Sequence, residues 1–138
     1  MKVVKAQKVE DMEPFDPATQ KTYARFTVEH AKHFLENNPN AWVLDVRSQT
    51  EYDQGHLTGA VSFPYDFEKM SIEEELQKHS DRDLKTPVFA YGSKEDFHAI
   101  EVATRLRAAG FQFVSSLNGG IEDWMKLGLP VELKATAP

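Results

Sequence analysis

Residues 88–114 read VFAYGSKEDFHAIEVATRLRAAGFQFV, and they predict a strand, a loop, a helix and a second strand. Val88–Tyr91 is a short apolar run after a proline, as expected for a buried strand. Apolar residues then recur at helical spacing over residues 97–109, and Gly110 supplies a helix stop. We expect the next strand at 111–114. This order of elements indicates a parallel pair of strands joined by a right-handed crossover.

The same alternation extends toward the N-terminus. Thr27 is a suitable N-cap for a helix over residues 28–37. Residues 41–46 form an apolar run short enough to be a buried parallel strand, and a second strand is expected at 60–63. Between these strands, residues 50–54 have room for a single helical turn. The pattern of strands alternating with helices predicts an α/β fold with a parallel sheet and helices on both faces.

Two further helices are predicted from capping and stop signals. Ser71 and Glu74 form a capping-box pattern that opens a polar helix reaching residue 79. The Gly119–Gly120 pair introduces a short helix that contains Trp124 and Met125, both of which we expect in the core.

Composition limits the classes of function. The chain has 138 residues, which suits one domain, and its net charge of −6 disfavours binding to nucleic acid or to an anionic membrane. It lacks a long apolar segment, so we expect a cytoplasmic protein without a membrane partner. We divide it into an irregular N-terminal extension (1–24), one domain (25–132) and a C-terminal tail (133–138).

Metal and cofactor sites have little support in the sequence. There is no cysteine, and only His30 and His33 of the five histidines lie close together. Two histidines three residues apart on a helix can share a face, but they fit a solvated helix better than a metal site. We therefore predict no metal and no cofactor.

Two segments resemble the rhodanese-like domain family. The first is VLDVRSQTEYDQGHLTGAVSFP, residues 43–64, and the second is VFAYGSKEDFHAIEVATRLRAAGF followed by VSSLNGGIEDW. The resemblance covers about residues 27–130. It implies a three-layer α/β/α sandwich around a five-stranded parallel sheet, in a single-domain member of the family.

Four residues of the first segment match family positions with a structural role. The resemblance implies that Asp45, Arg47, Glu51 and His56 form hydrogen bonds and ion pairs that hold loops at the strand ends. Partly buried charges require such partners. We therefore expect these residues to support the fold rather than to contact a ligand.

The resemblance also identifies what is missing. Family members that are sulfurtransferases carry a cysteine at the start of the loop after the strand matching Val88–Tyr91, and this cysteine becomes a persulfide. Counting forward from Pro87 puts Gly92 in that position, whereas counting back from Gly110 puts Ser93 there. We favour Gly92, since a strand register slips less readily than a loop.

The corresponding loop has also lost its usual charge. It comprises Gly92, Ser93, Lys94, Glu95, Asp96 and Phe97. The arginine found later in the family's loop is replaced by Asp96 or Phe97. One lysine and two acidic residues leave a net negative charge, which weakens the attraction for thiosulfate or phosphate.

The leading hypothesis is a non-catalytic module that binds an unidentified protein or small molecule through this loop. One alternative is an enzyme of non-thiol chemistry, with Ser93 and His98 as nucleophile and base or Glu95 or Asp96 as an acid or base. A second alternative is a sulfurtransferase whose cysteine codon was changed to serine in the expressed gene. A third is an interaction surface elsewhere, such as the N-terminal extension.

Overall fold

The computed structural model of the chain describes residues 24–64, 76, 83–94 and 98–133. The elements are β1 (Ala24–Phe26), α1 (Val28–Asn37), β2 (Trp42–Asp45), α2 (Gln49–Gln54), β3 (His56–Leu57), β4 (Val61–Ser62), β5 (Val88–Tyr91), α4 (His98–Ala108), β6 (Val114–Leu117), α5 (Gly120–Lys126) and β7 (Val131–Glu132). The central sheet has five strands in the order β1-β6-β5-β2-β4, and every neighbouring pair is parallel. The predicted five-stranded parallel sheet is confirmed.

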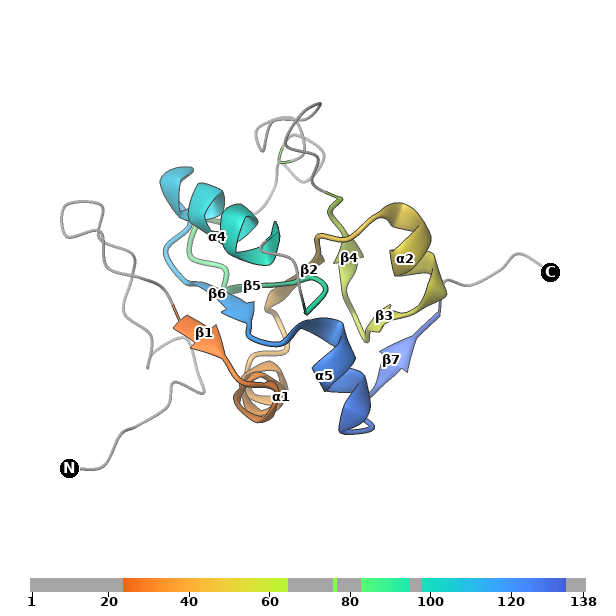
Figure 1. Cartoon of the computed structure of the whole chain (residues 1–138). Helices are drawn as coiled ribbons and strands as arrows, with labels where there is room; N and C mark the ends of the chain where they lie inside the picture. Colours follow the sequence, from red (N-terminus) through yellow and green to blue (C-terminus); the bar gives the residue numbers. More distant parts are fainter. Residues whose placement is uncertain (1–23, 65–75, 77–82, 95–97, 134–138) are drawn as a thin grey trace.

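Helices cover both faces of the sheet (Figure 1). Helix α4 packs on one face, over apolar residues of β2 and β5 that include Leu44, Val88 and Ala90. Helices α1 and α5 pack on the other face, over Phe89 and Tyr91 of β5. Because alternate residues of β5 enter opposite cores, this central strand is buried along its whole length.

Local sequence signals account for the helices that the sequence predicts. The hydroxyl of Thr27 accepts a hydrogen bond from the backbone N–H of His30 at 3.2 Å, so it caps α1 as expected. The buried residues Val28, Ala31 and Phe34 lie on the apolar face of that helix. These contacts confirm the helix predicted over residues 28–37.

One strand lies later in the chain than the sequence predicts. The strand expected at 111–114 is β6, at Val114–Leu117, so the prediction was wrong by three residues. Phe111 instead completes the end of α4, since its N–H donates to the carbonyl of Leu106 at 3.1 Å. Its ring lies 5.9 Å from that of Trp42, so Phe111 is buried without belonging to a strand.

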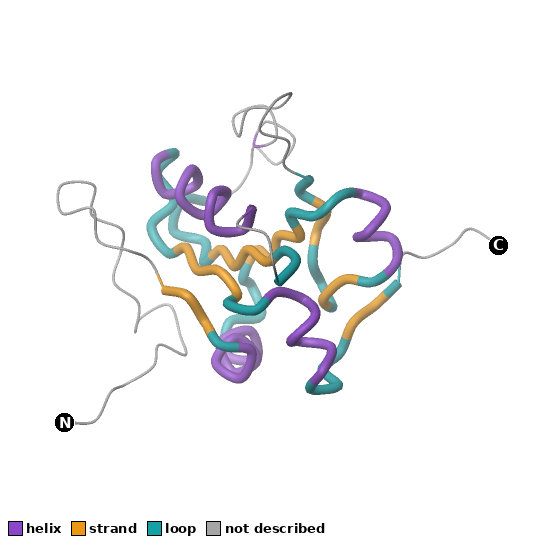
Figure 2. The backbone as a smooth tube through the Cα atoms, in the orientation of Figure 1, coloured by secondary structure: helices purple, strands orange, loops and turns teal. Residues whose placement is uncertain are grey.

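Three strands were not anticipated from the sequence. Strand β1 occupies the sheet edge beside β6, and β3 pairs with β7 in a separate antiparallel sheet of two strands. All three have only two or three residues, too few for a periodic pattern. The tube view in Figure 2 shows the small sheet beside the central one.

Of the two α5 residues that we expect in the core, only one is buried. Trp124 is buried as predicted, but Met125 is 55% exposed, so its placement in the core was wrong. It falls on the solvent side of the short helix α5, where a lone apolar residue is common. Of the helix predicted from Ser71, only Leu76 lies within the described residues, where it is helical, and the extension up to residue 23 lies outside them. No helix in the described part of the chain is long and apolar enough to cross a membrane.

Candidate functional site

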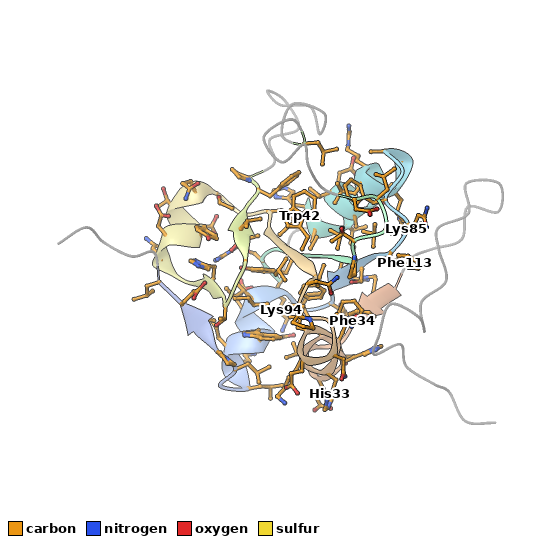
Figure 3. The ribbon with its side chains drawn as sticks, turned by 180° about the vertical axis from the view of Figure 1, so that it is seen from behind. His33, Phe34, Trp42, Lys85, Lys94 and Phe113 are labelled. Atoms are coloured by element: carbon orange, nitrogen blue, oxygen red, sulfur yellow. The ribbon has the colours of Figure 1, made fainter. Side chains whose placement is uncertain are left out.

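The loop after β5 rests on the beginning of α5. The carbonyl of Gly92, the first residue after the strand, accepts a hydrogen bond from the N–H of Ile121 at 2.9 Å. The N–H of Lys94 donates to Oε1 of Glu122 at 2.9 Å, and Lys94 Nζ lies 3.4 Å from Oδ1 of Asp123. Figure 3 labels Lys94 beside this helix. The carboxyl end of β5 is therefore joined to α5 through backbone and side chain.

Gly120 allows this close approach. A Cβ atom at position 120 would lie 2.6 Å from the carbonyl carbon of Ser93 and 2.8 Å from the carbonyl oxygen of Gly92, and it would also meet the N–H nitrogen of Lys94. The backbone of Gly120 has a φ of +69°, which glycine adopts without strain. Only a residue without a side chain lets the loop contact α5 in this way.

These contacts reduce the attraction of the loop for an anion. Backbone N–H groups in such a loop are the donors that would hold an anion. Here the Lys94 N–H already donates to a carboxylate of the same chain, and Asp123 offsets the charge of the Lys94 side chain. The described part of the loop therefore presents less positive potential than its one lysine suggests.

The residues of the non-thiol alternative flank a part of the loop that is not described. Gly92 and Ser93 are the first two residues after β5, and His98 is the first residue of α4. Glu95, Asp96 and Phe97 lie between them and outside the described residues. The choice between Gly92 and Ser93 as the cysteine position stays a prediction.

Asp45 anchors a buried hydrogen-bond network next to the loop. Its side chain is fully buried, and Oδ2 accepts from the hydroxyl of Tyr91 at 2.7 Å and from Arg47 Nη2 at 2.8 Å. Arg47 Nη2 also donates to the carbonyl of Gly55 at 2.6 Å, and the N–H of Leu57 donates to the Tyr91 hydroxyl at 3.0 Å. The network joins the ends of β2 and β5 to the segment containing α2 and β3.

The network shifts two pKa values. Burial, together with the neighbouring Asp45 carboxylate, raises the pKa of Tyr91 far above its ordinary value. Burial alone would lower the pKa of Arg47, but its hydrogen bonds and attraction to Asp45 outweigh this effect and raise that pKa. Tyr91 thus remains a neutral donor and Arg47 a cation at physiological pH.

The other two residues of the first segment also contact protein groups. Glu51 accepts from the N–H and hydroxyl of Ser48 at 3.4 and 3.0 Å, which completes a capping box at the start of α2. His56 is buried with its ring stacked on Tyr52 at 3.7 Å, and its Nε2 lies 3.3 Å from Glu132 Oε1. Both residues therefore make contacts within the fold, to Ser48, Tyr52 and Glu132.

Within the described ranges, the two histidines on α1 are not part of a larger group of metal-ligating side chains. The ring of His30 lies 4.2 Å from that of Phe26, between centroids. Figure 3 labels His33 on the outer side of α1. No group of three metal-ligating side chains occurs among the described residues.

Sequence reasoning missed Glu122 and Asp123. Both lie about thirty residues beyond the loop, so no local pattern linked them to Lys94. The Gly119–Gly120 pair was the available signal, because glycine allows backbone segments to approach closely.

Comparison with known proteins identifies one family and several similar proteins. Residues 20–127 match the rhodanese-like domain family. Thiosulfate sulfurtransferase 16 of Arabidopsis thaliana is 33% identical over 64% of this chain and 78% of its own length. The uncharacterized protein YibN of Escherichia coli is 30% identical over 70% of this chain and 64% of its own length. The crystal structure of the Alr3790 protein from Anabaena superposes with a TM-score of 0.66 and 30% identity, over 80% of this chain and 94% of that one.

Proposed function

This chain belongs to the rhodanese-like domain family, and we propose that it acts as a non-catalytic binding module without sulfurtransferase activity. The observation that carries the proposal is the absence of cysteine from the whole sequence. Persulfide transfer requires a sulfur nucleophile, and neither a glycine nor a serine at the start of the loop can supply one. In this proposal the loop binds a partner protein or a small molecule in the cytoplasm.

The electrostatics of the loop support the same proposal. The Glu122 carboxylate accepts a hydrogen bond from the backbone N–H of Lys94, and Asp123 forms an ion pair with the Lys94 ammonium. A thiosulfate dianion at this position would meet two carboxylates from α5. Loss of the nucleophile is therefore accompanied by weaker attraction for the anionic substrate.

Intact packing beneath the loop also supports a retained binding role. The buried Asp45 network holds the ends of β2 and β5, and the close contact at Gly120 holds residues 92–94 against α5. Residues 92–94, held by these contacts, present a defined surface, which lowers the entropic cost of binding.

Sulfur transfer from thiosulfate to cyanide tests the catalytic part of the proposal. We expect no turnover from metal-free, purified full-length protein, with the Arabidopsis thiosulfate sulfurtransferase as the positive control. Gly92→Cys and Ser93→Cys should each stay about a hundredfold or more below that control, because the loop electrostatics remain unfavourable. Turnover by the unaltered chain would overturn the proposal.

Capture of binding partners tests the role of the loop. The full chain and a Lys94→Glu variant are immobilised and exposed to the same source lysate. Proteins retained by the full chain and lost by the variant are expected, since the substitution replaces the only positive charge of the loop with a negative one and removes the ion pair with Asp123. Identical capture by both proteins would contradict binding through the loop.

A further inference from the structure

A depression of about 500 Å³ lies beside the loop, at the carboxyl ends of β1 and β6. The start of α1 and the helix α5 border it, and these two helices lie on the same face of the sheet (Figure 1). Its volume falls within the range of roughly 300–1,000 Å³ that is common for small-molecule sites. The carboxyl edge is also where parallel α/β sheets bind ligands.

The depression contains charges of both signs. Glu29 comes from α1 and Lys126 from α5, and neither forms an ion pair within the part of the chain that the structure describes. Asp123 also lines the depression, but Lys94 offsets its charge at 3.4 Å. Among the described residues, a carboxylate and an ammonium without an ion-pair partner therefore line the same small volume.

Two other features define its polarity. Asn118 follows β6, and its Oδ1 accepts from Arg25 Nη2 at 3.1 Å, which leaves the amide NH₂ group as a donor. Val28 and Leu127 add apolar surface, and Leu127 is 55% exposed. The depression thus offers a cation, an amide donor, two carboxylates and a small apolar area.

We propose that this depression binds a small zwitterion of the α-amino acid class with an aliphatic side chain. The ligand ammonium pairs with Glu29, because Asp123 already pairs with Lys94, and the ligand carboxylate pairs with Lys126 and the Asn118 amide. The aliphatic side chain lies against Val28 and Leu127. A purely anionic ligand would be repelled by the two carboxylates, and a purely cationic ligand would be repelled by Lys126.

This inference goes beyond the proposed role of the loop and is tested separately from it. A failure to bind an amino acid leaves the sulfur-transfer and loop-capture results unchanged. The reverse also holds, because the depression needs no cysteine and includes none of the residues 92–94.

Titration of the full-length ¹⁵N-labelled chain with three related probes tests the proposal by NMR. L-Leucine carries both charges, L-leucinamide only the positive one and N-acetyl-L-leucine only the negative one. We expect L-leucine to shift the amide resonances of residues 27–29, 118 and 123–127 in a saturable way. Each singly charged probe should bind about tenfold or more weakly, since it loses a charged hydrogen bond.

Matched variants assign the two charges. Glu29→Gln and Lys126→Gln should each weaken L-leucine binding about tenfold. Glu101→Gln on α4 and Lys85→Gln before β5 change the same kinds of charge on other parts of the surface, and they should leave binding unchanged. The proposal is overturned if L-leucine gives no saturable shift at tens of millimolar, if the three probes bind equally, or if the control variants weaken binding as much.

Discussion

Asp45 shows at the scale of one residue how a buried charge is held in this domain. Its carboxylate has no contact with solvent, and it accepts from the Arg47 guanidinium, the Arg47 N–H and the Tyr91 hydroxyl. The resemblance to the rhodanese-like family implied that Asp45 and Arg47 have a structural role. It gave no sign of Tyr91, which lies 46 residues away and reads as an ordinary strand residue.

We expect Arg47→Met to destabilise the protein strongly. The substitution leaves the buried Asp45 carboxylate without its cation, and breaking a buried pair from one side costs about 3–5 kcal/mol. Urea denaturation measures the free energy of unfolding. Arg105→Met is the matched control, because its pair with Glu101 is 45% exposed on both sides and should contribute less than about 1 kcal/mol. Equal losses in both variants would refute the argument.

At the scale of elements, long periodic segments were predictable and short paired ones were not. Helix α4 and strand β5 lie where the apolar pattern places them. The two-residue strands β3 and β7 exist because they pair with each other, across a separation of about seventy residues. The same limit applies to the contact between the loop after β5 and α5, since it depends on how two distant elements meet.

Gly120→Ala tests that contact between elements. A methyl group would collide with the backbone of residues 92–94 and would sit at a φ of +69°, so we expect a loss of about 2–4 kcal/mol in the free energy of unfolding. Gly128→Ala provides the control, because Gly128 has the same φ of +69° and nothing within 4 Å of a Cβ. That variant should lose only the backbone part, about 1 kcal/mol.

The two glycine variants also differ in the expected NMR spectrum. Gly120→Ala should shift the amide resonances of Ser93 and Lys94, whereas Gly128→Ala should leave them in place. Equal loss of stability in the two variants, with unchanged resonances of Ser93 and Lys94, would show that the close approach at Gly120 does not contribute to the free energy of unfolding.

At the scale of the whole molecule, the Tyr91 hydroxyl joins the two sheets. It donates to Asp45 at the end of β2 and accepts from the N–H of Leu57 in β3, which pairs with β7. The parallel central sheet was predictable from the alternation of elements. Its link to the small sheet was not, because it depends on contacts between residues far apart in the chain, such as Tyr91 and Leu57.

We expect this link to make the protein sensitive to alkaline pH. The pKa of Tyr91 is raised in the folded state from an ordinary value of about 10. Above that pH the unfolded chain releases a proton that the folded chain retains, so the free energy of unfolding falls as pH rises. The slope for one such group reaches about 1.4 kcal/mol per pH unit.

Tyr91→Phe should flatten that slope. Urea denaturation from roughly pH 8 to roughly pH 11 compares the two proteins, and the raised pKa of Tyr52 contributes equally to both. Near neutral pH the variant should be less stable by about 1–3 kcal/mol, because the buried N–H of Leu57 loses its acceptor. Parallel curves above pH 10 would show that Tyr91 does not control the alkaline transition.

The position of β1 in the sheet determines when it can pair while the chain is being synthesised. Arg25 of β1 and Asn118 after β6 share a hydrogen bond, although they are 93 residues apart in the chain. Strand β1 precedes β6 in the chain, so it pairs with β6 only after β6 has been synthesised. Until then Phe26 and the unpaired edge of β5 stay accessible, and such surfaces attract chaperones and other nascent chains. The central sheet is therefore complete only after residues 114–117 have been synthesised.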